Sequence, residues 1–141
     1  MSLIIDIADA VTLSLNEGSF DPAFDAYRKY VPVSELSDLA TLTVTVVPKS
    51  VEIASASRTQ DYFDCTVDIG IQQKIDTDDS DAVDALADLV EQIIDHLRHN
   101  NLTSPAASWT GIANEPIFSV DNFDNQRVFT SLVSVTYRAR R

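Results

Sequence analysis

The residues with the clearest potential for chemistry lie at the start of an acidic segment. Asp76, Asp78 and Ser80 have the spacing of the first three ligands of an EF-hand calcium loop. The sixth position of such a loop requires glycine and the twelfth a bidentate glutamate, but the sequence has Asp81 and Ala87 there. The pattern therefore favours an acidic turn at the start of a helix over a calcium site.

Histidine and cysteine offer little more support for a metal site. His96 and His99 are three residues apart, with Asp95 beside the first, so these side chains could lie near one another on a helix. Zinc normally takes a better-defined set of ligands, and the chain has no other histidine and a single cysteine, Cys65. A solvated helix end is the favoured interpretation, and we expect no metal and no cofactor.

Carboxylate pairs and nucleophiles are equally uninformative. Asp64 and Asp68 share one face of a strand, as glycosidase acids could, but acids at such positions more often keep a sheet face soluble. Cys65 lies among alternating apolar residues, which predicts a core position with no base beside it. The sequence lacks the GxSxG, GxGxxG and phosphate-loop motifs. We therefore predict that the protein is not an enzyme.

The composition is that of one folded domain covering residues 1–141. Hydrophobic residues make up 45% of the chain, with 5 prolines and 3 glycines. The net charge of -12 argues against a protein that wraps nucleic acid, because such binding uses Lys and Arg to displace phosphate counterions. Neither a signal peptide nor a membrane span is recognisable, and a lone cysteine suits a reducing compartment.

Two segments have helical periodicity. Apolar residues recur at helical spacing from Leu3 to Leu15, with Ser2 as a candidate N-cap and Gly18 as the stop. A wider apolar stripe follows the acidic turn and ends before Asn100, which predicts a helix of about 20 residues. The residues of this second stripe are Val83, Leu86, Ala87, Val90, Ile93, Ile94 and Leu97.

Other segments alternate as strands do. The predicted strands are residues 40–47, closed by Pro48, then 60–74, a short strand at 117–120, and 127–137. Residues 48–57 are interpreted as an irregular connection, and Ser104-Pro105 is interpreted as opening a second irregular region. The spacing of Phe24, Tyr27 and Tyr30 predicts a short helix or turn that packs on the core.

These elements predict an α+β fold in the order α-β-β-α-β-β. The alternation in 60–74 indicates a sheet with one buried and one wet face, which is typical of antiparallel pairing. Packing both helices on the buried face would cover the two apolar stripes. We therefore expect a mainly antiparallel sheet of about four strands with helices on one face.

Several segments resemble one protein family in their order along the chain and in their pattern of residue types. They are residues 39–48 (LATLTVTVVP), 57–58, 61–62, 67–74, 86–97, 109–118 (WTGIANEPIF), 127–131 and 137–138. In these segments, which fall within residues 36–141, the chain resembles the tail-terminator (tail-completion, head–tail joining) proteins of long-tailed bacteriophages and prophages. The resemblance is carried by the whole series, since no single segment is as diagnostic as a nucleotide-binding loop.

The resemblance implies a structural virion protein that is assembled in the host cytoplasm. Proteins of this family form a six-fold homohexameric ring that caps the tail tube, ends its polymerisation and presents the docking surface for the head-neck. The implied partners are further copies of the chain, the tail-tube protein and a head-neck protein, with no membrane. DNA would pass through the ring without specific binding, and an acidic surface suits such a channel because like charges repel.

The sequence also suggests which residues would serve in such a ring. For subunit contacts we select Val51, Ile53, Arg58, Trp109 and Phe118. The first two lack an evident core partner, and Trp and Arg are enriched at the centres of interfaces. Trp109 fits a core position equally well.

Two sets of acids are candidates for lining a channel. The preferred set lies on the second helix and comprises Asp84, Asp88, Glu91 and Asp95, and the other is Asp64 with Asp68 on the long strand. Arg138, Arg140 and Arg141 are interpreted as partners for acids of a neighbouring molecule. The alternatives are another neck or head-closure connector subunit and, in a different class, an acidic DNA-mimic inhibitor.

Overall fold

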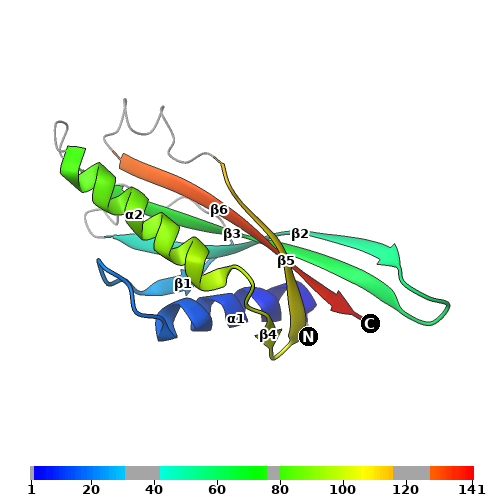
Figure 1. Ribbon diagram of the computed structural model, residues 1–141. Helices are drawn as coiled ribbons and strands as arrows, with labels where there is room; N and C mark the ends of the chain where they lie inside the picture. The colour runs from blue at the N-terminus through cyan, green and yellow to red at the C-terminus, as the bar shows by residue number, and fades with distance from the viewer. Residues whose placement is uncertain (1, 31–41, 76–79, 116–127) are drawn as a thin grey trace.

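The computed structural model describes residues 2–30, 42–75, 80–115 and 128–141, which form one sheet and two helices (Figure 1). In chain order the elements are α1 (Leu3–Glu17), β1 (Ala26–Arg28), β2 (Thr43–Ser55), β3 (Asp61–Lys74), α2 (Ser80–Leu97), β4 (Leu102–Thr103), β5 (Ala106–Asn114) and β6 (Val128–Arg140). The predicted strand at 117–120 and the aspartates at 76, 78 and 79 lie outside the described residues.

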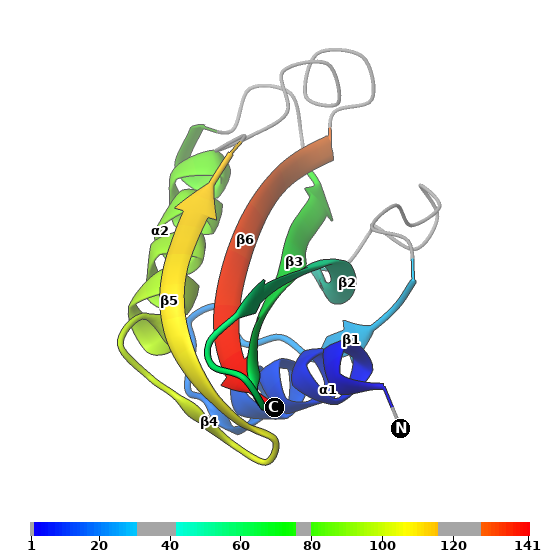
Figure 2. The same ribbon diagram turned by 90° about the vertical axis from the view of Figure 1, so that its right-hand side faces the viewer.

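The sheet is larger and less regular than the sequence predicts. Within the described ranges it has six strands in the order β1-β2-β3-β6-β5-β4. β1 runs parallel to β2, and the other neighbouring pairs are antiparallel. Figure 2 shows that the sheet curls as it crosses from β5 to β2. The expected α-β-β-α-β-β order with about four mainly antiparallel strands is therefore wrong.

The central pair, β3 with β6, forms the long spine of the sheet. Its register runs without a break from Tyr62 opposite Arg140 to Lys74 opposite Val128. On β3 the predicted alternation is present, because Cys65 and three aliphatic residues that follow it on the same face are fully buried. These three are Val67, Ile69 and Ile71.

β2 does not end at Pro48, as the sequence suggested. It continues to Ser55, paired with β3, and a bulge at Lys49 accommodates the proline, which cannot donate to the ladder. The interpretation of residues 48–57 as an irregular connection is wrong for this reason. The bulge breaks the alternation that would have revealed a strand.

The aromatic segment after α1 forms strand β1 rather than the predicted short helix or turn. The side chain of Asn16, near the end of α1, accepts a hydrogen bond from the backbone N–H of Ala26 (2.7 Å) and donates one to its carbonyl (3.0 Å). Ala26 is thereby fixed beside β2. Tyr27 and Tyr30 are 56% and 74% exposed, so the expectation of core packing is wrong for them, whereas Phe24 does pack against the core.

The region after Ser104-Pro105, expected to be irregular, contains β5. A register shift between Trp109 and Gly111 leaves Thr110 as an extra residue. Small residues such as Ala106, and this shift, hide the period of two in the sequence. β5 nevertheless pairs with β6 over most of its length.

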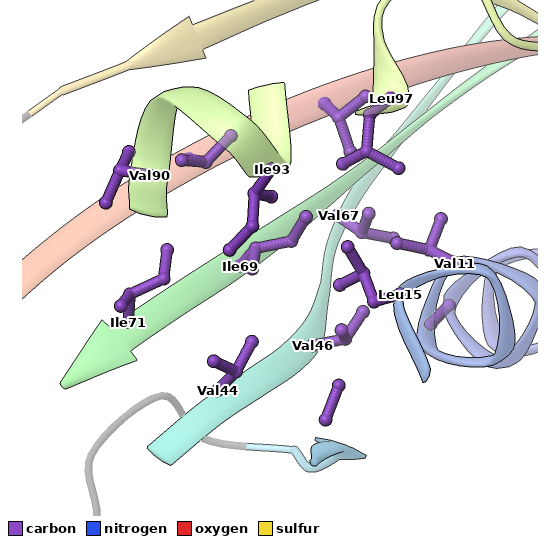
Figure 3. Close-up of a cluster of buried hydrophobic side chains, with 14 of the residues drawn as sticks. Val11, Leu15, Val44, Val46, Val67, Ile69, Ile71, Val90, Ile93 and Leu97 are labelled. Carbon is purple, nitrogen blue, oxygen red and sulfur yellow. The ribbon is translucent and has the colours of Figure 1, made fainter. Parts of the chain in front are cut away.

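The core lies between one face of the sheet and the two helices. Figure 3 shows Val11 and Leu15 of α1 and Ile93 of α2 meeting side chains of β2 and β3. The predicted apolar stripe of α1 is confirmed by the burial of Ile7, Ala8, Val11 and Leu15. On α2 the stripe is confirmed at Leu86, Val90, Ile93 and Leu97, and it also includes Leu89, which the sequence reading omitted.

A buried hydroxyl in this core gives the first testable prediction. Tyr137 of β6 is fully buried, and its hydroxyl has no hydrogen-bond partner among the described residues. Burying an unpaired hydroxyl is unfavourable, so Tyr137→Phe should raise the free energy of unfolding by about 1 kcal/mol. Urea unfolding followed by circular dichroism measures this, with the exposed Tyr27→Phe as the matched control.

The same variant should change the alkaline stability. Burial raises the pKa of Tyr137 to about 12, above the value of about 10 in an unfolded chain. The unfolded state therefore loses its proton first, and stability due to this group is complete below pH 10 and is lost between about pH 10 and 12. The wild type should weaken relative to Tyr137→Phe across that window. A constant difference from pH 8 to 11.5 would contradict the assignment.

Candidate functional site

The two histidines do not form a common site. The His96 Nε2 lies between the helices, 3.0 Å from the Ser14 hydroxyl and 3.1 Å from its carbonyl oxygen. The His99 ring instead packs against Trp109, with ring centres 4.8 Å apart and the ring planes tilted by 55°. Asp95 points to another partner, because its carboxylate pairs with Arg98 at 3.0 Å. In the described part of the chain, no group of three or more His, Cys, Asp or Glu residues could hold a metal ion.

Cys65 lies in the core, as its position in the sequence predicted. Its side chain is fully buried, and burial, with a smaller contribution from Asp64, raises the pKa of its thiol. The thiol is therefore kept in its protonated, unreactive form. Cys65 therefore serves as a small apolar side chain on the core face of β3.

The outer face of the β3–β6 pair carries a ladder of paired polar side chains. Arg138 donates two hydrogen bonds to Asp64, at 2.7 and 3.0 Å, and this contact lowers the pKa of that carboxyl. The hydroxyls of Thr66 and Thr136 lie 2.9 Å apart. Arg138 also stacks over the Tyr62 ring, 4.5 Å from its centre.

Asp68 belongs to the same ladder. Its carboxylate accepts a hydrogen bond from Ser134 and lies 3.7 Å from the Lys49 ammonium. Both acids of this strand face, Asp64 and Asp68, are thus neutralised by neighbours. The face offers hydrogen-bonding groups but little net negative charge.

On α2, by contrast, most of the acids have no cationic partner among the described residues. The predicted channel acids Asp84, Asp88, Glu91 and Asp95 are exposed along the helix. Among the described residues, Arg98 is the one cation that pairs with any of them. Of the two sets of acids, the helix set is therefore the one that presents uncompensated charge to solvent, and its placement in a channel stays a prediction.

The residues selected for subunit contacts have different surroundings. Val51 and Ile53 are 40% and 61% exposed on the far part of β2, and Arg58 is exposed in the turn that follows. Trp109 is half-buried against the core and His99, which fits the core alternative better than a free anchor. Phe118 lies outside the described residues.

One surface feature was not recognised from the sequence. A groove of about 350 Å³ runs between α1 and the β4–β5 turn and is lined by Asp6, Asp9, Ala10, Leu13, Ser104 and Pro105. Leu13 is 59% exposed there, whereas the opposite face of α1 is buried. The groove is formed only when the turn folds against the helix, so periodicity alone could not reveal it.

Comparison with known proteins finds a likeness in fold. No protein-family model matches the sequence, and no curated protein matches it. Among solved structures, the chain is similar to a chain of the virion of a native gene transfer agent (GTA) particle, with a TM-score of 0.59 and 15% identity. The likeness covers 99% of this chain and 96% of that chain. At this identity the likeness establishes the shared fold.

No helix in the described ranges has the length and apolar character needed to cross a membrane.

The exposed positions on β2 give a second prediction. Ile53 is 61% exposed, so Ile53→Ala should lower the free energy of unfolding of the monomer by less than about 1 kcal/mol. Ile69, on the paired strand, is fully buried, and Ile69→Ala should cost about 3 kcal/mol. Urea unfolding at a protein concentration that keeps the chain monomeric compares the two. Equal losses would show that Ile53 is a core residue.

Proposed function

We propose that the chain is a structural subunit of a phage or phage-like virion, which forms a homohexameric ring on the end of a tail tube. In this role it stops tube polymerisation and provides the surface on which the head-neck docks. The observation that carries the proposal is the fold likeness, over nearly the whole of both chains, to a component of a gene transfer agent virion. The segments of the sequence that resemble tail-terminator proteins support the finer assignment.

The surface of the molecule suits such a role in two respects. The exposed acids of α2 would repel the DNA backbone, so a channel lined by Asp84, Asp88, Glu91 and Asp95 would let DNA pass without binding it. Val51 and Ile53 leave apolar surface on a strand that extends beyond the helices. The partners are then other copies of the chain, the tail-tube protein and a head-neck protein, and the protein resides in the virion after assembly in the host cytoplasm.

A second candidate from a different class is an acidic DNA-mimic inhibitor. The row of exposed carboxylates on α2 is the observation that favours it, because such proteins present acids in place of phosphates. This function would require a monomer or dimer that binds a basic enzyme tightly. The neutralised acids of the β3–β6 face count against it, since they leave only one acidic row.

The oligomeric mass separates these functions. We expect light scattering of the purified chain to give a hexamer, six times the 15.5 kDa of the chain or about 93 kDa. The hexamer fraction should rise from 0.01 to 0.15 M salt, because copies with a net charge of -12 repel one another less as the screening length falls. Rings in electron micrographs of the same sample would support the assembly.

A chain that stays at 15.5 kDa under all these conditions would contradict a ring that forms without the tail and would favour the DNA mimic. A hexamer that binds tail-tube subunits and stops their polymerisation would support the terminator over another neck connector. A hexamer that binds only portal-side proteins would favour the connector.

A further inference from the structure

The β2–β3 hairpin extends from the body of the molecule as an arm. We define the arm as residues 49–64, from the bulge of β2 through the turn to the first part of β3. Figure 1 shows it reaching past both helices, away from α2. Beyond Val46 the outer edge of β2 has no partner strand among the described residues. The arm is thus open on one edge and on the face that the helices cover elsewhere.

That face of the arm is apolar. Val51 lies opposite Cys65 and Ile53 opposite Phe63, so all four side chains belong to the face that forms the core farther along the sheet. The helices do not reach this part, which leaves Val51 and Ile53 40% and 61% exposed. Exposed β-branched residues side by side on one edge strand are typical of a surface that another chain covers.

The opposite face of the arm is held rigid. Tyr62 lies under Arg138, at 4.5 Å, and Asp64 accepts two hydrogen bonds from that guanidinium. The backbones of Asp61 and Arg141 exchange two further hydrogen bonds, at 2.6 and 3.0 Å. The apolar face is therefore presented in a fixed orientation, which lowers the entropy that binding would cost.

The arm and its base are also the basic end of an acidic molecule. Lys49 and Arg138 pair with Asp68 and Asp64 of the same copy, and Arg140 and Arg141 line a pocket together with Asp6. Arg58, at the exposed tip, is a cation of the arm with no ion-pair partner in the described ranges. A matching surface must therefore be both apolar and acidic. The acidic face of α2 does not qualify. None of the exposed large apolar residues in the described part of the chain lies on that helix, so its face is acidic but not apolar.

The groove beside α1 has both properties. Leu13, Ala10 and Pro105 provide apolar lining, and Asp6 and Asp9 provide negative charge. Asp9 already pairs with Arg28, whereas Asp6 has no ion-pair partner in the described ranges.

We propose that the arm of one copy docks in the α1 groove of the next copy, with Val51 and Ile53 against Leu13 and Arg58 near Asp6. This contact deepens the proposed ring function and rests on it. Because it joins two different surfaces, it is heterologous, and its repetition closes a ring when each contact turns the next copy by one sixth of a full rotation. One kind of contact then suffices for the whole assembly.

Cysteine cross-linking tests the pairing directly. Ile53→Cys and Leu13→Cys are made as separate variants, and the buried native Cys65 is left in place because a reagent cannot reach it. Mixed and treated with a short bismaleimide, they should give a cross-linked dimer as the main product. Neither variant alone should cross-link, and Ile53→Cys mixed with Tyr27→Cys, another exposed position, serves as the matched control.

The outcomes separate this contact from the function on which it rests. A chain carrying both cysteines should give a ladder of covalent species that ends at the hexamer. Cross-linking of Ile53→Cys with itself would show a symmetric contact and overturn the proposal, as would a hexamer that does not cross-link. If light scattering finds no multimer at all, the ring function fails together with the contact.

Charge exchange provides an independent test of the same contact. Arg58→Glu and Asp6→Lys should each raise the concentration at which half of the chains are assembled by about tenfold. A chain carrying both changes should recover most of the wild-type midpoint, because the pair is restored with its signs exchanged. Lys29→Glu, which changes a cation outside the arm and the groove, controls for net charge. Additive losses in the double variant would overturn the pairing of Arg58 with Asp6.

Discussion

The pairing of β3 with β6 is the constraint on which the other elements depend. Because its register is unbroken along both strands, each side chain is assigned to one face, with Cys65, Val67, Ile69 and Ile71 toward the core and Asp64, Thr66 and Asp68 on the outer face. A slip of one residue would move Ile69 and Val133 to the wet face and Asp68 to the core. The polar ladder of Asp64 with Arg138 and Thr66 with Thr136 opposes such a slip, since each pair needs its partner directly opposite.

The same pairing determines which acids of β3 have partners. On β3, Asp64 lies opposite Arg138 and Asp68 opposite Ser134, and Asp68 also pairs with Lys49, so both acids have partners. Acids on α2 face solvent on a helix that has Arg98 as its nearest cation in the sequence, and most of them have no cationic partner among the described residues. The uneven charge distribution follows from which acids lie beside a partner in the fold, so the net charge of -12 alone could not locate it. Any partner with a negative backbone meets repulsion mainly on the α2 side.

The sequence predicted the elements whose burial is uniform along their length. α1, β3, α2 and β6 each lie against the core for most of their residues, so their period is continuous. β1 was not predicted because its Tyr27 lies among aromatics at helical spacing, with Phe24 before it and Tyr30 after it. Its position is fixed by hydrogen bonds from Asn16, ten residues before Ala26 in the chain. β5 was not predicted because the extra residue Thr110 interrupts its alternation. The exposure of Ile53 was anticipated, whereas the groove that holds Leu13 requires knowledge of where the β4–β5 turn folds.

The bulge at Lys49 connects the fold to the proposed assembly. Before it, Val44 and Val46 point to the core, and with unbroken alternation Val51 and Ile53 would have pointed to the outer face. The extra residue reverses this phase, so both face the helix side, and Glu52 instead lies opposite Asp64 on the wet face. The extra residue thus places Val51 and Ile53 on the same face of the sheet as the core residues. They remain uncovered because neither helix extends over this part of the sheet. Without the shift the same two side chains would lie on the wet outer face, so the shift alone does not remove them from water. The shift becomes favourable once a second chain removes them from water, which is why the bulge supports an arm that is completed by a neighbouring copy.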